Sequence, residues 1–353
     1  MRSLLGYRAE AVKLVPIALA LVLAHAGCAG RDSGAGPRHR SKGPKELTVV
    51  VGGDVLLGRG VAARAKRSSW RRLLCGVAPT LRGADLTIAN LESPLAPCLG
   101  GGSVRTPRLC GDPRGVAALR GAGIDAVTLA NNHALDAGPQ GLRRTARLLR
   151  RAGITPLGVQ AALTGRPLAE PLGRITVVAV NLTRPALAPG RQVALPTPAA
   201  VAAEIRRARS AAPHRPVLVL AHLGREYDPY PGPRERAFGR AAVTAGAAAV
   251  LLHGSHVRRA QVHDRGVPVH LGLGNLLFDQ RDPRTRTGAL VTLRLAAGRP
   301  AQVLAERCVD SHLGTLMRCP KSHGSPGPLL LAPHPRSTRG RLTRAAEHRI
   351  VRP

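Results

Sequence analysis

Short runs of β-branched and aliphatic residues alternate with segments of helical periodicity from Leu47 onward. Strands that alternate with helices along a chain favour a largely parallel sheet that is buried on both faces. The predicted strands are Leu47–Val51, Leu86–Ala89, Ala126–Leu129, Ile175–Val180, Val217–Ala221, Ala248–Leu252, Val267–Leu271 and Ala289–Leu295. The predicted helices are Pro113–Gly121, Pro139–Ala152, Ala199–Ala211 and Arg234–Ala245. The last strands follow one another without helices, which predicts an antiparallel layer in an α/β fold.

The composition limits both the core and the partners. Of the 353 residues, 44% are hydrophobic but only 2% are aromatic, so Ala, Leu and Val must fill the core. The formal net charge is +33, and nearly all of the basic residues are Arg. Because Arg is in excess together with Ala, Gly and Pro, we interpret the charge as a compositional bias. No basic cluster or aromatic platform typical of nucleic-acid binding accompanies it, but the field would attract acidic polymers or anionic lipid headgroups.

The amino terminus has the pattern of an export signal. Arg2, Arg8 and Lys13 precede the apolar run Leu14–Ala24, and a small-residue site with Cys28 follows. A charged region, a short apolar region and a small-residue site are typical of a secretory signal peptide, and the run is short for a membrane span. A cysteine after Ala-Gly resembles a bacterial lipobox. We therefore predict a signal peptide over residues 1–28 and a membrane-anchored lipoprotein acylated at Cys28; plain secretion, into the medium or periplasm, and a retained anchor are the alternatives.

Three further segments follow the predicted signal. Residues 29–45 are rich in Gly, Pro and charge without periodicity, which predicts a flexible linker. Residues 46–310 carry the strand and helix patterns and form the predicted domain. Residues 320–353 read as a basic disordered tail.

Export permits disulfides, and the cysteine count leaves their pairing open. With Cys28 set aside for lipidation, five cysteines remain. Cys98 with Cys110, and Cys308 with Cys319, are the candidate disulfides, and this pairing would leave Cys75 free.

Polar residues that can bind metal occur where predicted strands stop. They are Asp54, the Asn90-Leu91-Glu92 segment, the Asn131-Asn132-His133 segment, His222, and the His253-Gly254-Ser255-His256 segment. The carboxyl ends of strands in an α/β sheet converge on one crevice. A mixed set of carboxylates, amides and imidazoles suits Mn, Fe or Zn better than Ca. Each segment alone is also compatible with a turn or a helix cap, but their shared position predicts a metal centre.

Six short blocks occur in the order found in one protein family. They are Gly53–Arg59 (GDVLLGR), Asp85–Leu95 (DLTIANLESPL), Leu129–Gly138 (LANNHALDAG), His222–Tyr227 (HLGREY), His253–Val257 (HGSHV) and Leu273–Asp279 (LGNLLFD). Together they resemble the CapA family of capsule and poly-γ-glutamate biosynthesis proteins. The resemblance implies a calcineurin-like metallophosphoesterase fold, with layered sheets flanked by helices.

The resemblance also implies roles for individual residues. The implied ligands of two divalent metal ions are Asp54, Glu92, Asn132, His222, His253 and His256. His133 would face the substrate as a general acid or electrostatic donor. Residues expected to contact the substrate or support the ligands are Arg59, Asn90, Glu226 and Asn275. Ordinary metallophosphatases have a His where this chain has Leu56, so we expect one of the two metal sites to be weak or vacant.

Two functions fit this pattern. The first is a metal-dependent hydrolase or phosphoesterase-like enzyme in the biosynthesis or export of a capsule-type polymer. Its substrate would be an anionic extracellular polymer or its phosphorylated precursor. The second is a non-catalytic component of the same machinery, in which metals stabilise a surface that binds the anionic polymer.

Overall fold

The structure is a computed structural model that describes residues 46–100, 107–183 and 193–320. The predicted signal peptide, Cys28, the linker and the tail beyond Pro320 lie outside the described residues and stay predictions. Within the described residues, none of the helices has the length and apolar character needed to cross a membrane.

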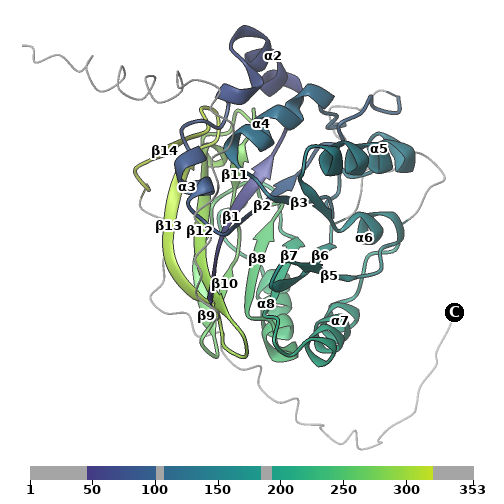
Figure 1. Ribbon diagram of the computed structural model, residues 1–353, viewed down its shortest axis with the longest axis vertical. Helices are drawn as coiled ribbons and strands as arrows, with labels where there is room; N and C mark the ends of the chain where they lie inside the picture. The colour runs from purple at the N-terminus through teal and green to yellow at the C-terminus, as the bar shows by residue number, and fades with distance from the viewer. Residues whose placement is uncertain (1–45, 101–106, 184–192, 321–353) are drawn as a thin grey trace, which may run out of the picture.

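Two β-sheets form the centre of the molecule (Figure 1). The first sheet has the strand order β14-β13-β12-β1-β2-β3-β4, and β11 also pairs with β1. Its strands are β1 (Glu46–Val55), β2 (Leu86–Leu91), β3 (Ala126–Thr128), β4 (Thr155–Leu157), β11 (Asn275–Leu277), β12 (Thr287–Ala296), β13 (Gln302–Asp310) and β14 (Thr315–Met317). Strands β1 to β4 are parallel, whereas β12, β13 and β14 add an antiparallel part.

The second sheet has the order β5-β6-β7-β8-β10-β9. Its strands are β5 (Ala169–Leu172), β6 (Ile175–Asn181), β7 (Val217–His222), β8 (Ala249–His253), β9 (Gln261–Asp264) and β10 (Val267–His270). Strands β6, β7, β8 and β10 run parallel, so the ends of β7 and β8 bring His222 and His253 into register.

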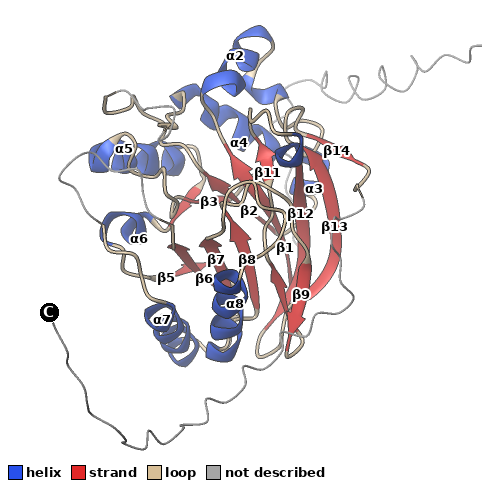
Figure 2. Ribbon diagram, turned by 180° about the vertical axis from the view of Figure 1, so that it is seen from behind, coloured by secondary structure: helices blue, strands red, loops and turns tan. Residues whose placement is uncertain are grey.

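Helices cover the outer faces of both sheets (Figure 2). On the first sheet lie α2 (Arg59–Arg67), α3 (Ala78–Arg82), α4 (Val116–Ala122) and α5 (Gly138–Arg151), with α6 (Val159–Thr164) next to α5. On the second sheet lie α7 (Pro198–Ala211) and α8 (Pro233–Ala245). Short 3-10 turns cover Trp70–Arg72, Pro113–Gly115 and Pro283–Arg286. The architecture is therefore helices, sheet, sheet, helices.

Alternation along the strands explains the layering. In β6, Ile175 and Val177 face the core between the sheets, whereas Val178 and Val180 face α7 and α8. Side chains point to opposite faces of a strand at successive positions, so a strand between two apolar layers is apolar throughout. Burying one such Val or Ile contributes roughly 1.5–3 kcal/mol, which these central strands repeat on both faces.

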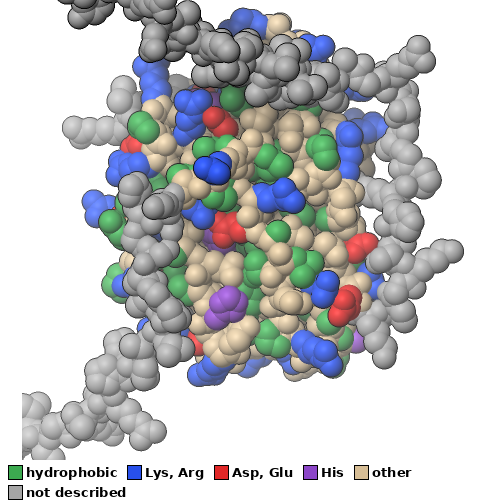
Figure 3. Space-filling model, turned by 90° about the vertical axis from the view of Figure 1, so that its left-hand side faces the viewer, with side chains coloured by type: hydrophobic (Ala, Val, Ile, Leu, Met, Phe, Trp, Pro, Cys, Tyr) green, Lys and Arg blue, Asp and Glu red, His purple; other side chains and the backbone are tan. Residues whose placement is uncertain are grey.

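The sequence predictions for the fold are confirmed in outline. All eight predicted strands and all four predicted helices are present, and the antiparallel layer near the end exists as β12–β14. The α/β class with layered sheets and flanking helices is confirmed. The surface that presents β13 carries Lys and Arg scattered among apolar and neutral side chains, without one basic patch (Figure 3).

The cysteines agree with the predicted pairing except at one position. Cys98 is bonded to Cys110, and Cys308 is bonded to Cys319. Cys75 is disulfide-bonded as well, so the expectation of a free thiol there is wrong. That expectation depended on removing Cys28 from the count.

Candidate metal centre

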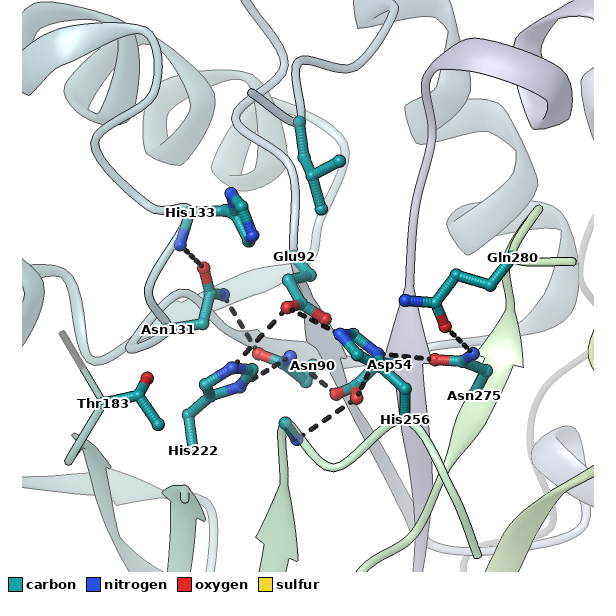
Figure 4. A network of polar contacts seen from close by, with 12 residues as sticks. Asp54, Asn90, Glu92, Asn131, His133, Thr183, His222, His256, Asn275 and Gln280 are labelled. Carbon is teal, nitrogen blue, oxygen red and sulfur yellow. Dashed lines mark hydrogen bonds and ion pairs between the residues drawn. The ribbon is translucent and has the colours of Figure 1, made fainter. Parts of the chain in front are cut away.

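The polar strand ends of both sheets meet at one place (Figure 4). β1 carries Asp54 near its end, Glu92 directly follows β2, and His222 is the last residue of β7. His256 follows β8 by three residues and has a left-handed backbone conformation with φ 56°. Each of these four side chains is at most 3% exposed. The carboxyl ends of parallel strands from both sheets thus deliver acidic and imidazole groups to the same buried point.

Two glycines allow this close approach. A Cβ on Gly53 would lie 2.0 Å from the carbonyl oxygen of Gly274, so only glycine lets β1 run against the turn before β11. A Cβ on Gly254, where φ is 92°, would lie 2.7 Å from Nε2 of His222. The register of β1 also shifts between Val51 and Asp54, which aims the Asp54 side chain at the site.

Three ligand atoms of the cluster lie close enough to share one ion. One ligand atom each from Asp54, Glu92 and His256 lie within 4.8 Å of one another. His256 Nδ1 is 3.3 Å from Asp54 Oδ2, and its Nε2 is 3.5 Å from Glu92 Oε1. Nε2 of His222 approaches the same Glu92 oxygen at 3.5 Å. Glu92 is therefore the carboxylate common to both imidazoles.

Amide side chains hold Asp54 in place. Asn90 donates from Nδ2 to Asp54 Oδ1 at 2.8 Å, and its own Oδ1 accepts a hydrogen bond from Asn131 at 3.1 Å. The backbone N–H of Gly254 donates to Asp54 Oδ2 at 3.2 Å. Hydrogen bonds of this kind orient a ligand without neutralising its charge.

Two histidines are oriented so that one ring nitrogen is free to accept a metal. His253 Nε2 lies 3.1 Å from the carbonyl oxygen of Gly52, and a carbonyl can only accept, so Nδ1 keeps its lone pair. His256 Nδ1 lies 3.0 Å from Oδ1 of Asn275, which leaves its Nε2 lone pair facing Glu92. A ligating histidine commonly donates its other N–H to a carbonyl or carboxylate in this way.

Buried atoms without partners test whether these residues fit a cation. In the described part of the chain, Glu92 Oε1 and Oε2, Asn132 Oδ1 and His253 Nδ1 are buried and accept no hydrogen bond. An ionised carboxylate without hydrogen bonds is costly to bury unless a cation compensates it. All four atoms belong to predicted metal ligands. The donor set therefore fits divalent metal ions.

The pKa values of the buried acids and histidines are shifted for the same reason, because their charges are not fully compensated by hydrogen bonds. Burial raises the pKa of Glu92 well above its ordinary value. Burial also lowers the pKa of His222 to about 3 and lowers that of His253. For His256, burial alone would lower the pKa, but the carboxylates of Glu92 and Asp54 outweigh burial and raise it to about 10. The same balance acts on Asp54, where burial is outweighed by the histidines and the pKa falls.

A family model for bacterial capsule synthesis protein PGA_cap matches residues 48–280. The chain belongs to this family. Residues 48–280 contain all six sequence blocks and every side chain of the cluster, so the resemblance found in the sequence is confirmed.

Curated relatives agree with the family. "Capsule biosynthesis protein CapA" of Bacillus anthracis is 27% identical over 301 residues, covering 80% of this chain and 72% of the relative. "PGA biosynthesis protein CapA" of Bacillus subtilis (strain 168) is 25% identical over 290 residues, covering 80% and 75%. A "probable polyglutamine synthesis accessory protein" of Mycobacterium tuberculosis is 28% identical over 296 residues, covering 67% and 75%. Among solved structures, Haemophilus influenzae NAD nucleotidase aligns with TM-score 0.45 and 10% identity, over 75% of this chain and 56% of that one.

The structure joins four of the six predicted ligands by short contacts. Asp54, Glu92, His222 and His256 form that group. Asn132 and His253 make no side-chain hydrogen bond or ion pair with it among the described residues, and each has a buried acceptor atom without a hydrogen-bond partner there. Leu56 packs in a small apolar cluster with Leu109 and Phe278. At that position the chain offers no metal ligand.

His133 lies beside the cluster and is held by a residue that sequence reasoning missed. Its Nδ1 is 2.8 Å from Oδ2 of Asp136, and its backbone N–H donates to Asn131 Oδ1 at 3.2 Å. Asp136 is fully buried. The spacing of three residues within the LANNHALDAG block is a signal that could have found Asp136, because His133 and Asp136 can meet across one turn.

The four supporting residues have different surroundings. Asn90 and Asn275 orient Asp54 and His256, respectively. Arg59 is paired with Asp279 and lies over the Phe278 ring, 5.8 Å from its centroid. Glu226 is exposed at the rim, where its charge helps to raise the pKa of Glu92 and His256.

A hydrogen-bond chain that the sequence did not indicate continues outward from His256. Asn275 donates to Oε1 of Gln280 at 2.8 Å, and Gln280 donates to the Tyr227 hydroxyl at 3.1 Å. Tyr227 is 38% exposed, so this chain links a buried imidazole to the rim of the site.

Proposed function

We propose that this protein acts in the biosynthesis or export of an anionic capsule-type polymer as a metal-dependent hydrolase of the phosphoesterase type. The observation that carries the proposal is the Glu92 carboxylate, which is fully buried and accepts no hydrogen bond from the described residues, next to Asp54, His222 and His256. A buried acidic group among imidazoles supports a divalent cation better than it supports a structural core.

Six residues would hold the metals in this proposal. They are Asp54, Glu92, Asn132, His222, His253 and His256. Mn, Fe or Zn suits such a set, and the apolar surroundings of Leu56 support one weaker site of the two. When bound, such ions supply Lewis acidity and an activated water.

The chain's own contribution to catalysis centres on His133. Asp136 accepts a hydrogen bond from Nδ1–H and fixes the ring, so that the protonated imidazole can give its Nε2 proton to the leaving oxygen of the substrate. In the same way, a buried aspartate orients the catalytic imidazole of the Ser-His-Asp triad. Asn132, the preceding residue, turns a neutral amide oxygen toward a cation instead, because neighbouring side chains on a loop diverge.

The substrate class follows from charge and from the relatives. Two relatives carry capsule or PGA biosynthesis in their names, and this chain has a net charge of +33. An anionic extracellular polymer, or its phosphorylated precursor, would be attracted by that field.

A second function is supported by the depth of the centre. Asp54 and Glu92 are fully buried and His256 is 2% exposed, which suits an ion that stabilises the fold. In that case the protein would be a non-catalytic component that binds the polymer on its surface.

Hydrolysis of a chromogenic phosphodiester by the purified domain tests the proposal. We expect turnover only when Mn, Fe or Zn is added, with loss of turnover in Glu92→Gln. Bound metal without turnover, combined with polymer production in cells that carry His133→Ala, would support the non-catalytic function instead.

We also propose that the protein is exported and held on the membrane by acylation of Cys28. The support is the sequence of the amino terminus alone. Two or three acyl chains anchor a protein stably, whereas one does not. Cys28→Ala is expected to release the protein from the membrane fraction or to block its processing. Mass spectrometry of the mature amino terminus decides this, and a non-reducing digest of the same sample identifies the partner of Cys75. An acylated Cys28 has no thiol left for a disulfide, so a bond between Cys28 and Cys75 in that digest would overturn the acylation.

A further inference from the structure

Two chain segments joined by the Cys98–Cys110 disulfide contact Asp136 at three points. The N–H of Leu99 donates to the Asp136 carbonyl at 3.0 Å, and Nη1 of Arg108 donates to the same oxygen at 3.2 Å. The N–H of Leu109 donates to the carboxylate oxygen Oδ2 at 2.5 Å. The first two bonds hold the backbone of Asp136, and the third holds its side chain.

That third bond sets the direction of the carboxylate. Oδ2 accepts from Leu109 and from His133, whereas Oδ1 is buried and has no partner in the described residues. Apart from His133, the N–H of Leu109 is the donor to this carboxylate among the described residues. The orientation of the carboxylate therefore depends on the position of that N–H. The N–H of Leu109 therefore fixes the aim of Asp136, and Asp136 fixes the ring of His133.

The position of Leu109 is in turn fixed from two sides. Its side chain packs with Leu56 and Phe278, and the Phe278 ring lies 5.0 Å from the His256 ring. The next residue, Cys110, passes so close to the start of α2 that a Cβ on Gly58 would lie 2.1 Å from its carbonyl oxygen. The Cys98–Cys110 disulfide connects the segment that contains Leu109, which is packed from both sides, to the segment that contains Leu99.

We propose that the Cys98–Cys110 disulfide is a positioning element for catalysis, which aims His133 through Leu109 and Asp136. The inference rests on the proposed function of His133. The sequence around Leu99 contains three consecutive glycines, Gly100, Gly101 and Gly102, and glycine is the residue that loses most freedom on ordering. A covalent closure removes part of that entropy cost, so its loss frees Leu109 and misaligns the imidazole. A displacement of about 1 Å in a reacting group lowers a rate by up to about 100-fold.

The second disulfide provides a matched control. Cys98 and Cys110 are 12 positions apart, and Cys308 and Cys319 are 11 apart. Among the described residues, neither Cys308 nor Cys319 hydrogen-bonds to Asp136 or His133. We expect C98S/C110S to lower kcat by about 10- to 100-fold with metal content unchanged, and C308S/C319S to change kcat by less than about twofold.

The His133→Ala background separates positioning from a general weakening of the fold. There, C98S/C110S should have no further effect on the remaining rate, because the group that it aims is gone. An equal fold-loss in the wild-type and His133→Ala backgrounds, or an unchanged kcat in C98S/C110S, would overturn the inference. C98A/C110V, whose apolar side chains fill the space of the bridge, is measured in parallel in case the serine variant does not fold.

NMR of ¹⁵N-histidine-labelled protein tests the inference even if the protein hydrolyses nothing. A hydrogen-bonded Nδ1 proton on His133 should be visible in the wild type and in C308S/C319S, and should be lost in C98S/C110S and C98A/C110V. Absence of turnover with this pattern would refute the proposed function and leave the positioning role intact. Persistence of the proton in both bridge variants would refute the positioning role alone.

Discussion

Two buried glutamates in this fold have opposite surroundings. Glu235 on α8 forms an ion pair with Arg259 at 3.0 Å, and Arg259 also donates to the carbonyl oxygens of Asp228 and Arg225 at 2.9 Å. Glu92 is equally buried, but within the described chain it accepts no hydrogen bond, and imidazoles approach one of its oxygens no closer than 3.5 Å. The fold thus satisfies one acid internally and leaves the other for an ion from outside.

The largest expected effect concerns the groups beside Glu92. His133→Ala should keep its metals and lose about 10²–10⁴-fold in rate, the usual contribution of general acid catalysis. Asn132→Ala should lose rate and metal together, because its amide oxygen is buried without a hydrogen-bond partner among the described residues and is proposed to bind a cation. Metal analysis and kinetics on the same preparations measure both. Equal metal loss in the two variants would mean that His133 is a ligand and not a substrate-facing acid.

The comparison itself is tested by removing each glutamate's charge in metal-free protein. Glu235→Gln leaves Arg259 buried without its counter-ion and should lower the free energy of unfolding by about 3–5 kcal/mol. Glu92→Gln removes a charge that had no hydrogen bond and should leave the stability unchanged or raise it. Urea denaturation in the presence of a chelator measures both values. A similar loss in Glu92→Gln would show that the fold does compensate Glu92.

The stability gained on adding metal distinguishes the two glutamates in a second way. An ion that binds only the folded state, at 100 times its dissociation constant, raises the free energy of unfolding by about 2.7 kcal/mol. We expect this gain in the wild type and in Glu235→Gln, and none in Glu92→Gln. Glu226→Gln should keep most of it, because Glu226 is exposed and influences the cluster only by its charge. Metal content measured after gel filtration provides the check. A greater loss in Glu226→Gln than in Glu92→Gln would exchange their roles.

Strands that are apolar on both faces made most of the fold predictable. β6, β7 and β8 read as strands from the sequence because their aliphatic residues pack into one of two cores. α2 and β13 were not predicted, because α2 is largely basic and β13 has polar residues at half of its positions. α2 is stabilised by packing one face against the core, and β13 by pairing with β12. Neither interaction can be read from the pattern of residues within the element itself.

The site was predictable where a residue directly follows a strand. Asp54, Glu92 and His222 lie together because parallel strands end at one edge. The spacing from His133 could indicate a contact with Asp136, but the orientation of its carboxylate could not be predicted, because it depends on an N–H from Leu109, 27 positions earlier in the chain. The tautomer of His253 likewise depends on the carbonyl of Gly52, 201 positions away.

The smallest expected effect concerns a third glutamate, Glu306, which has two partners. Burial alone would raise its pKa, but His270 and Arg258 outweigh burial and lower it to about 2, whereas the pKa of Glu92 is raised. Arg258 Nε lies 2.7 Å from one oxygen and His270 Nε2 lies 3.6 Å from the other. A carboxyl whose folded pKa is depressed stabilises the fold above its unfolded pKa of about 4.3 and loses that stability as the pH falls. Because the Glu306 side chain is 22% exposed, solvent screening reduces the contribution to about 1–2 kcal/mol.

The window for this loss lies between about pH 4.5 and pH 2, and Glu306→Gln should abolish it. The difference in unfolding free energy between the wild type and Glu306→Gln, measured by urea denaturation across that window, isolates it from the other carboxyl groups. Asp282→Asn is the matched control, because Asp282 also has a pKa lowered to about 2, by a hydrogen bond from Arg284. Asp282 and Arg284 are two residues apart, so the pair persists in the unfolded chain and should change stability less. If the two variants show the same dependence on pH, tertiary contacts with Arg258 and His270 do not set the acid stability at Glu306. The contrast with Glu92 would then reflect burial alone.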